Sequence, residues 1–241
     1  MTNKATNTTT SKCMLMDTGE GTFGQLVRLC GGVDAAEREI SNLICVWISH
    51  MHADHHLGLV RVLSHFKGKD PVLVIGPAAL QEWLNLVTQV HSSLKSTFTF
   101  VDANSMRTNS FRGTSSENLE YAKKRLRNVL NLSLETVPVF HPSSSSGLIM
   151  NQTLDDNDSN IFKLVYSGDT TPCKHLIEAG KNATILIHEA TFEDGMESEA
   201  KKKRHSTIGQ ALEVGRKMNA HRIVLTHFSA RYTKSSPCST I

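Results

Sequence analysis

The chain has 241 residues, of which 39% are hydrophobic and 20% are charged, and its formal net charge is +3. This composition indicates an ordinary globular protein, and one large domain is favoured because no central segment resembles a linker between two complete cores. The small positive charge neither requires nor excludes a nucleic-acid partner, since the clustering of charge matters more than its total.

The first half of the chain alternates apolar runs with helix-like segments. Residues 1–12 are polar and predict a disordered tail that lacks the apolar centre of a secretory signal. The segment CMLMDTGEGTFGQLVRL (13–29) predicts a short strand, a Gly-rich turn and a helix, and AALQEWLNLVTQVH (78–91) predicts a second helix. Continuous apolar runs predict buried strands at LICVWIS (43–49), PVLVIGP (71–77) and FTFVDA (98–103).

The second half repeats the alternation after a loop rich in Ser, Thr, Asn, Arg and Gly (104–118). Helical spacing predicts a helix with a basic, solvated face over 117–131. A further helix is predicted from Ser206, which we expect to be its N-cap. Four more strands are predicted, at 135–141, 161–169, 183–190 and 222–229, with a hairpin between the first two.

The alternation of strands and helices predicts an α/β architecture. Polar residues stand at the ends of five of its apolar strands, at 50–55, 141, 169, 188–189 and 227. Because strands fix position while the loops that follow them stay open to ligand, we expect a functional site where these ends meet.

The segment SHMHADHHLGL (49–59) is the most informative of these strand ends. His50 and His52, at i and i+2, can point to the same side of an extended segment, while Asp54 and His55 can face a second point nearby. Imidazole and carboxylate groups are zinc ligands, and two ions about 3.5–4 Å apart can act together on a phosphodiester. A hydrogen-bonded structural role suits a lone histidine better, but the clustering of four donors favours a metal site.

Three further strand-end residues complete the predicted metal centre. Asp169 is suited to bridge two ions, and His141 and His227 could complete their ligand shells. His56 is out of phase and stays unassigned. We expect ordinary structural roles for His65, His91, His175 and His221. Because nitrogen and oxygen donors accept several metals, manganese is an alternative to zinc.

Cysteines and apolar runs exclude other classes of protein. The five cysteines are scattered and form no C-x-x-C pair, which argues against a disulfide scaffold and a structural zinc knuckle. No apolar run approaches the roughly 20 residues that span a bilayer, so no membrane partner is expected. The nucleus, the mitochondrion and the cytosol all remain open as compartments.

Several motifs together resemble a known family. SHMHADHHLGL resembles the signature of the metallo-β-lactamase superfamily. In the same order as in the family, DTGEGTFGQL, YSGDTTPC, HEATFEDG, RHSTIGQALEVG and IVLTHFSARY resemble tRNase Z, specifically the carboxy-terminal half of its long form. The resemblance covers residues 13 to about 232. It implies a metallo-β-lactamase-like αββα sandwich, with a catalytic domain over residues 13–241, and a zinc-dependent endoribonuclease that removes 3′ trailers from precursor tRNA.

The same resemblance implies roles for individual residues. Zinc ligands are implied in two sets, with Asp169 bridging them: His50, His52 and His141, then Asp54, His55 and His227. Asp54 is also implied as the general base, and Glu189 with His205 as a proton relay to the leaving oxygen. Independently of the family, a histidine paired with a carboxylate suits proton donation near neutral pH.

The sequence departs from the family pattern in three places. The strands that normally precede CMLMDTGEG are absent, so the first strands of the sandwich are expected to be missing, and the chain could need a partner. No Gly/Pro-rich arm for gripping tRNA is visible, so we expect weak tRNA binding by this chain alone. A separate amino-terminal half could supply the arm, and a homodimer is the alternative assembly. PSSSSG follows His141 where the family usually has a cysteine.

Other functions and smaller motifs stay open at this level. The chain could be another hydrolase of the fold, such as a small phosphodiesterase, although the HST element (205–207) argues against it. It could also be a non-catalytic fragment that binds tRNA or a partner. KKKR (201–204) could contact tRNA phosphates or be a solvated loop. DTGEG (17–21) could form a tight turn close to the metal centre or a plain turn.

Overall fold

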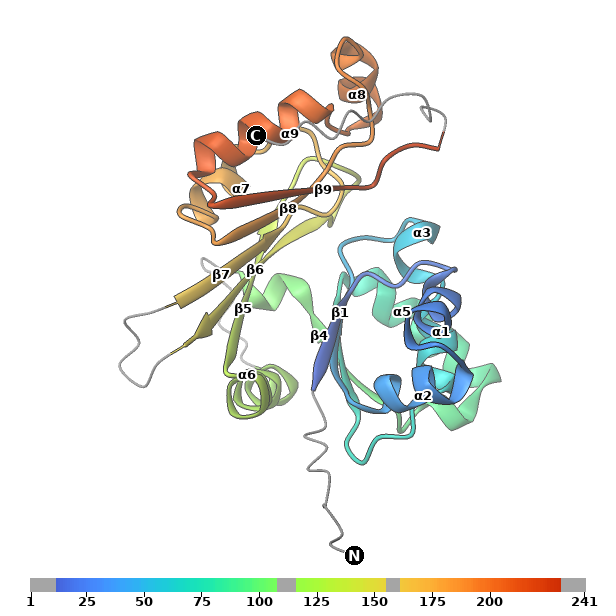
Figure 1. Ribbon diagram of the computed structural model, residues 1–241. Helices are drawn as coiled ribbons and strands as arrows, with labels where there is room; N and C mark the ends of the chain where they lie inside the picture. The colour runs from blue at the N-terminus through green and yellow to red at the C-terminus, as the bar shows by residue number, and fades with distance from the viewer. Residues whose placement is uncertain (1–11, 108–115, 155–160, 231–241) are drawn as a thin grey trace, which may run out of the picture.

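The computed structural model describes residues 12–107, 116–154 and 161–230, and these form four layers in the order helices, sheet, sheet, helices (Figure 1). The predicted tail, the middle of the loop at 104–118 and the predicted turn between 154 and 161 lie outside the described residues. The two sheets pack face to face, so each buries one face against the other and the opposite face under helices.

Within the described residues the first sheet has four parallel strands in the order β1-β2-β3-β4. Its strands are β1 (Cys13–Met16), β2 (Leu43–Trp47), β3 (Val72–Gly76) and β4 (Phe98–Asp102). Every residue of β2 and β3 is buried, which explains why both are continuous apolar runs in the sequence.

The second sheet, also within the described part of the chain, has five strands in the order β5-β6-β7-β8-β9. They are β5 (Leu132–Pro138), β6 (Ser146–Thr153), β7 (Ile161–Tyr166), β8 (Ile185–Glu189) and β9 (Arg222–Thr226). The pairs β5-β6 and β6-β7 are antiparallel, whereas β7-β8 and β8-β9 are parallel. The carboxyl ends of β7, β8 and β9 therefore meet at one edge.

The prediction that a strand runs to His141 is wrong. β5 ends at Pro138, because the residues after it form the turn that leads into β6. The turn is closed by the backbone hydrogen bonds from Val139 N to Ser145 O and from Ser145 N to Pro142 O. His141 thus stands on a loop beyond the strand, where its side chain can reach across to other elements.

Helices pack on the outer face of the first sheet, and a further helix packs into the core between the two sheets. Those on the outer face are α1 (Thr22–Cys30), α2 (Val33–Ser41), α4 (Leu59–Ser64) and α5 (Ala78–Val90), and their apolar faces share one core with β2 and β3. α6 (Glu117–Leu130) joins the core between the sheets, with η2 (Ala103–Met106) beside it. The short η1 (Ser92–Leu94) follows α5.

The second sheet is covered by α7 (Lys174–Ala179) and α9 (Ile208–Met218), which pack on it through a third apolar core. The prediction that Ser206 caps α9 is wrong. Thr207 is the N-cap, in a capping box with Gln210, while Ser206 Oγ donates to Thr170 O, 2.7 Å away. Among the described residues, no helix combines the length and apolar character needed to cross a membrane.

The loops that follow the strands come together at one end of the sandwich. The loop after β2 leads into the short helix α3 (Ala53–His56), which lies beside the carboxyl end of β9 in Figure 1. α8 (Glu197–Lys203) follows the loop after β8 and leads into the turn before α9. This end of the molecule holds the strand-end residues that the sequence singles out.

Candidate metal centre

The segment after β2 presents its histidines from a turn between a strand and a helix. His50 lies in the extended segment that continues β2, and His52 is the residue that precedes α3, with φ −73° and ψ 146°. Asp54 and His55 stand in the first turn of α3. The change from extended to helical backbone directs these two pairs of side chains toward two adjacent points.

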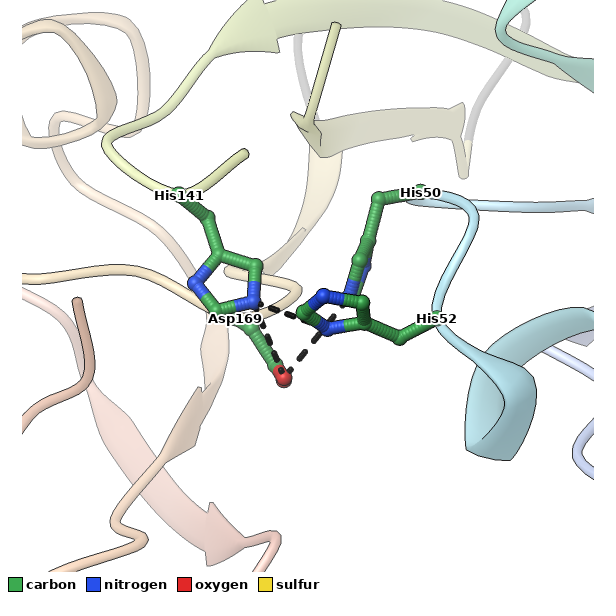
Figure 2. A group of neighbouring side chains, drawn as sticks. All are labelled: His50, His52, His141 and Asp169. Carbon is green, nitrogen blue, oxygen red and sulfur yellow. Dashed lines mark hydrogen bonds and ion pairs between the residues drawn. The ribbon is translucent and has the colours of Figure 1, made fainter. Parts of the chain in front are cut away.

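One group of donors gathers around His50 and His52 (Figure 2). His141 Nε2 lies 3.2 Å from His52 Nδ1 and 3.7 Å from Asp169 Oδ2, and His50 Nε2 lies 3.8 Å from the same Oδ2. The ligand atoms of these four residues all lie within 4.8 Å of one another. We call His50, His52, His141 and Asp169 the closed group, because His52 alone among them is exposed.

A second group lies beside it and shares the same carboxylate. His227 Nε2 lies 3.3 Å from Asp54 Oδ2, and His55 Nε2 lies 3.7 Å from it. Asp169 Oδ2 is 3.3 Å from His55 Nε2 and 3.4 Å from His227 Nε2. We call Asp54, His55 and His227 the open group, because the Asp54 side chain is 66% exposed. His227 adopts a left-handed backbone, with φ 61°, an unfavourable conformation of the kind that collects at functional sites.

Burial leaves two imidazole nitrogens of these groups without a hydrogen bond. Nε2 of His50 and Nε2 of His55 are buried, and neither has a hydrogen-bond partner in the described structure. The 3.3 Å contact of His55 with Asp169 is electrostatic and lacks hydrogen-bonding geometry. An unpartnered buried nitrogen is costly unless something else engages its lone pair. The donor set therefore fits divalent cations that prefer imidazole and carboxylate.

The centre has an uneven charge distribution even though its members lie close together. Burial lowers the pKa of His50 to about 2, and the neighbouring His55 adds to this effect. Burial also opposes a charge on His55, but the carboxylates of Asp169 and Asp17 outweigh it and raise its pKa to about 10. Burial would raise the pKa of Asp169, but His55 and the other imidazoles hold that pKa well below its usual range.

The sequence did not single out Asp17, which holds residues of the metal centre in place through hydrogen bonds. Asp17 Oδ1 accepts from Ser49 N at 2.7 Å, while Oδ2 accepts from His55 Nδ1 at 2.7 Å and from Tyr166 Oη at 2.8 Å. Nε2 of His55 is consequently the nitrogen left to face Asp169. The available signal was the acidic residue directly after β1, in the turn DTGEG.

That turn approaches the loop after β2 closely, as one reading of DTGEG predicts. A Cβ on Gly19 would stand 2.2 Å from Asp54 O, and one on Gly58 would stand 2.0 Å from Gly19 O. Thr18 N donates to His55 O at 2.7 Å, which ties the two segments together. Glycine is required at both positions because no side chain fits between the two backbones.

Glu189 and His205 form a pair next to both groups. His205 Nδ1 lies 2.8 Å from Glu189 Oε1, although the residues are 16 positions apart. Burial would lower the pKa of His205, but the hydrogen bond and charge of Glu189 outweigh it and raise that pKa. The His205 ring lies 4.8 Å from that of His141 and 5.6 Å from that of His227, measured between centroids.

The basic run at 201–204 has a structural contact as well as an exposed face. His141 Nδ1 donates to Arg204 O at 2.8 Å, and Arg204 Nη1 donates to His141 O at 3.2 Å. Lys201 and Lys203 line two cavities of about 380 and 390 Å³ that both open beside His205.

The remaining histidines make other contacts. His188 is fully buried and its Nδ1 hydrogen-bonds to Glu189 O, so it lies outside the donor groups found among the described residues. His56 Nδ1 bonds to His52 O, and its ring contacts Trp83. His65 bonds to Glu37. His91, His175 and His221 also lie outside the donor groups of the described residues. Cys13, Cys30, Cys45 and Cys173 are free thiols.

Comparison with known proteins places this geometry in a family. A family model described as a beta-lactamase superfamily domain matches residues 13–228. The chain is 36% identical over 225 residues to a protein named "Ribonuclease Z, mitochondrial" from Drosophila melanogaster, covering 92% of this chain and 28% of that protein. It is 41% identical over 234 residues to "Zinc phosphodiesterase ELAC protein 2" from Macaca fascicularis, covering 92% of this chain and 27% of that one. The chain thus spans less than a third of these relatives.

Solved structures agree with the sequence comparison. The crystal structure of a long form RNase Z from yeast superposes with a TM-score of 0.83 at 28% identity, covering 93% of this chain and 33% of that one. Human tRNase Z, short form, superposes with a TM-score of 0.67 at 24% identity, covering 92% of this chain and 83% of that one, and this likeness concerns the fold. The predictions of a metallo-β-lactamase-like sandwich and of a resemblance to long-form tRNase Z are confirmed.

Proposed function

Because the chain belongs to the beta-lactamase superfamily, we propose that it is a metal-dependent endoribonuclease that removes 3′ trailers from precursor tRNA. The relatives named ribonuclease Z and zinc phosphodiesterase support this substrate and reaction. One structural observation carries the proposal. Two donor groups share Asp169 Oδ2 and stand beside the Glu189–His205 pair, whose atoms are 2.8 Å apart.

In this proposal the two groups hold two divalent cations. The closed group holds one and the open group holds the other, with Asp169 serving both. Zinc suits these nitrogen and oxygen donors, and manganese is an acceptable substitute. When bound, such cations activate water as Lewis acids and neutralise charge that develops on a phosphodiester.

The chain's own residues move the protons of the reaction. Asp54, whose carboxylate is exposed beside the open group, accepts a proton from the attacking water. As the new bond to phosphorus forms, the bond from phosphorus to the tRNA 3′ oxygen breaks. His205 donates a proton to that oxygen, which leaves a 3′-hydroxyl on the tRNA and a phosphate on the trailer. Glu189 holds His205 through Nδ1 and favours its protonated form.

Metal analysis combined with trailer cleavage tests the function. The purified chain is assayed with precursor tRNA carrying a labelled 3′ trailer, and its bound metal is measured by mass spectrometry. We expect about two zinc ions per chain, and no cleavage by the Asp54→Ala variant. Asp70→Ala is the matched control, since Asp70 is exposed and precedes β3 at the opposite end of the sheet. Full cleavage by Asp54→Ala would contradict the assignment of the base.

Two further measurements separate the proposed function from the alternative functions. Turnover of bis(p-nitrophenyl) phosphate without cleavage of precursor tRNA would indicate a small-molecule phosphodiesterase. Binding of tRNA without either activity would indicate a non-catalytic fragment.

Precursor tRNA and a protein partner are part of the proposal. We propose a separate amino-terminal half as this partner, with a homodimer as the alternative; the chain covers 33% of the yeast long form. We expect the chain alone to bind tRNA weakly. Equal affinity of this chain and of a version fused to such a half, measured by gel shift, would count against that partner.

The compartment that relatives favour is the mitochondrion, because "mitochondrial" stands in the names of the Drosophila relative and of two relatives from Arabidopsis thaliana. A fluorescent fusion of the complete coding sequence tests this. A signal confined to the nucleus or the cytosol would overturn the assignment.

A further inference from the structure

Thr191, the last residue of the segment HEAT, makes contacts that neither the motifs nor the comparisons explain. It is the second residue after β8 and lies between the Glu189–His205 pair and the open group. Its Oγ1 is 2.7 Å from Glu189 Oε2 and 2.8 Å from His227 Nδ1. His205 Nδ1 lies farther away, at 3.3 Å.

The direction of these hydrogen bonds follows from a count of protons. A threonine hydroxyl carries one proton, and a carboxylate can only accept. The Thr191 proton therefore goes to Glu189 Oε2, and Oγ1 has only lone pairs to offer His227. His227 must then donate from Nδ1. A neutral imidazole with its proton on Nδ1 has its lone pair on Nε2.

Nε2 is the nitrogen that the open group uses. It lies 3.3 Å from Asp54 Oδ2 and 3.4 Å from Asp169 Oδ2, where the ligand atoms converge. A histidine binds a metal ion through an unprotonated nitrogen, and the hydrogen bond on its other nitrogen sets which one that is. The contact at Nδ1 thus decides whether His227 can serve as a ligand.

The carboxylate that receives the Thr191 proton is itself held firmly. Glu189 is 1% exposed. Oε1 accepts from Thr170 N at 2.8 Å, and Oε2 accepts from Thr191 N and Ser206 N, both at 3.2 Å. These backbone donors keep Glu189 in one position, so the Thr191 hydroxyl donates its proton to Glu189 Oε2.

We propose that Thr191 is a positioning residue that locks His227 in the tautomer able to bind a cation and ties this ligand to the Glu189–His205 pair. This inference rests on the proposed metal-dependent function. The Thr191 hydroxyl then affects both the binding of a cation to the open group and the orientation of the proton donor His205. Loss of the hydroxyl leaves Nδ1 of His227 without its acceptor and weakens the open group.

Two substitutions isolate the hydroxyl from the shape of the side chain. Thr191→Val keeps the shape and removes the hydroxyl, whereas Thr191→Ser keeps the hydroxyl. Thr184→Val is the matched control, because Thr184 precedes β8 at its other end and its Oγ1 accepts from Lys163 N at 3.1 Å. For Thr191→Val we expect about 10- to 100-fold weaker binding of the second zinc ion, measured by chelator competition, and wild-type affinity for the other two variants.

A spectrum of the unmodified protein tests the tautomer directly. In the zinc-loaded wild type with ¹⁵N-labelled histidine, the His227 signals, assigned with His227→Gln, should show the proton on Nδ1. A proton on Nε2 would overturn the inference even if Thr191→Val fails to fold. Unchanged binding of both zinc ions by folded Thr191→Val would also overturn it and leave the proposed function standing. If the wild type binds no zinc at all, the proposed function fails first and the inference fails with it.

Discussion

The closed and open groups share one carboxylate but differ in what surrounds them. In the closed group the side chains of His50, His141 and Asp169 are 2%, 1% and 3% exposed. In the open group His227 is 27% exposed and Asp54 is 66% exposed. The closed group comes from the loops that follow β2, β5 and β7, whereas the open group comes from α3 and from the residue that follows β9. Under the proposed function, we therefore expect water and substrate to reach the cations from the side of the open group.

The largest effect is expected where the two groups meet. Asp169→Asn removes the negative charge that all the neighbouring imidazoles share. We expect both cations to be lost and trailer cleavage to fall on the order of 10⁴-fold, as when one member of a catalytic unit is removed. Metal content and single-turnover kinetics measure the two effects. Retention of two zinc ions would show that the groups do not depend on each other.

The next largest effect should leave both groups intact. His205→Asn removes the proposed proton donor while the closed and open groups keep their own ligands. We expect kcat to fall about 10²-fold or more, the usual contribution of a general acid, with unchanged zinc content. A loss of zinc from this variant would mean that His205 is a ligand, as its closeness to Asp169 and His227 also allows.

The two cations should leave the protein one after the other. Because the open group is more exposed, a chelator should remove its cation first, and the cation of the closed group should follow more slowly. Each cation lost should lower the free energy of unfolding, by about 2.7 kcal/mol for a cation present at 100 times its Kd. Thermal unfolding during titration with chelator measures this. A single transition with simultaneous loss of both cations would remove the distinction between the groups.

The smallest effect is expected at the start of α9, behind the proton donor. Thr207→Ala removes the side-chain oxygen that accepts from Gln210 N. We expect the free energy of unfolding to fall by about 1 kcal/mol, as for other lost N-caps, with cleavage reduced only slightly. Thr207→Ser, which keeps the capping oxygen, is the control. A large loss of cleavage would show that the cap positions His205.

The elements with strong patterns were predictable from the sequence alone. β2 and β3 are uninterrupted apolar runs, and α5 shows helical spacing throughout, so their place in the chain agrees with the prediction. Short elements such as α3 and α7 were not predicted, because one turn or two of helix leave too little periodicity to recognise. The cap of α9 was misplaced by one residue, since Ser206 and Thr207 have equivalent hydroxyl groups and only their partners differ.

The sequence by itself determined which residues we propose to carry the chemistry of this protein. Nitrogen and oxygen donors that follow apolar strands are visible in the primary structure, and their order resembles one family. Only the tertiary structure decided how these donors are divided and directed. Asp17 turns His55 toward Asp169, and Thr191 turns His227 toward the same carboxylate. Hydrogen bonds between residues far apart in the chain set the tautomers of His55 and His227, and a linear pattern carries no record of which partners meet.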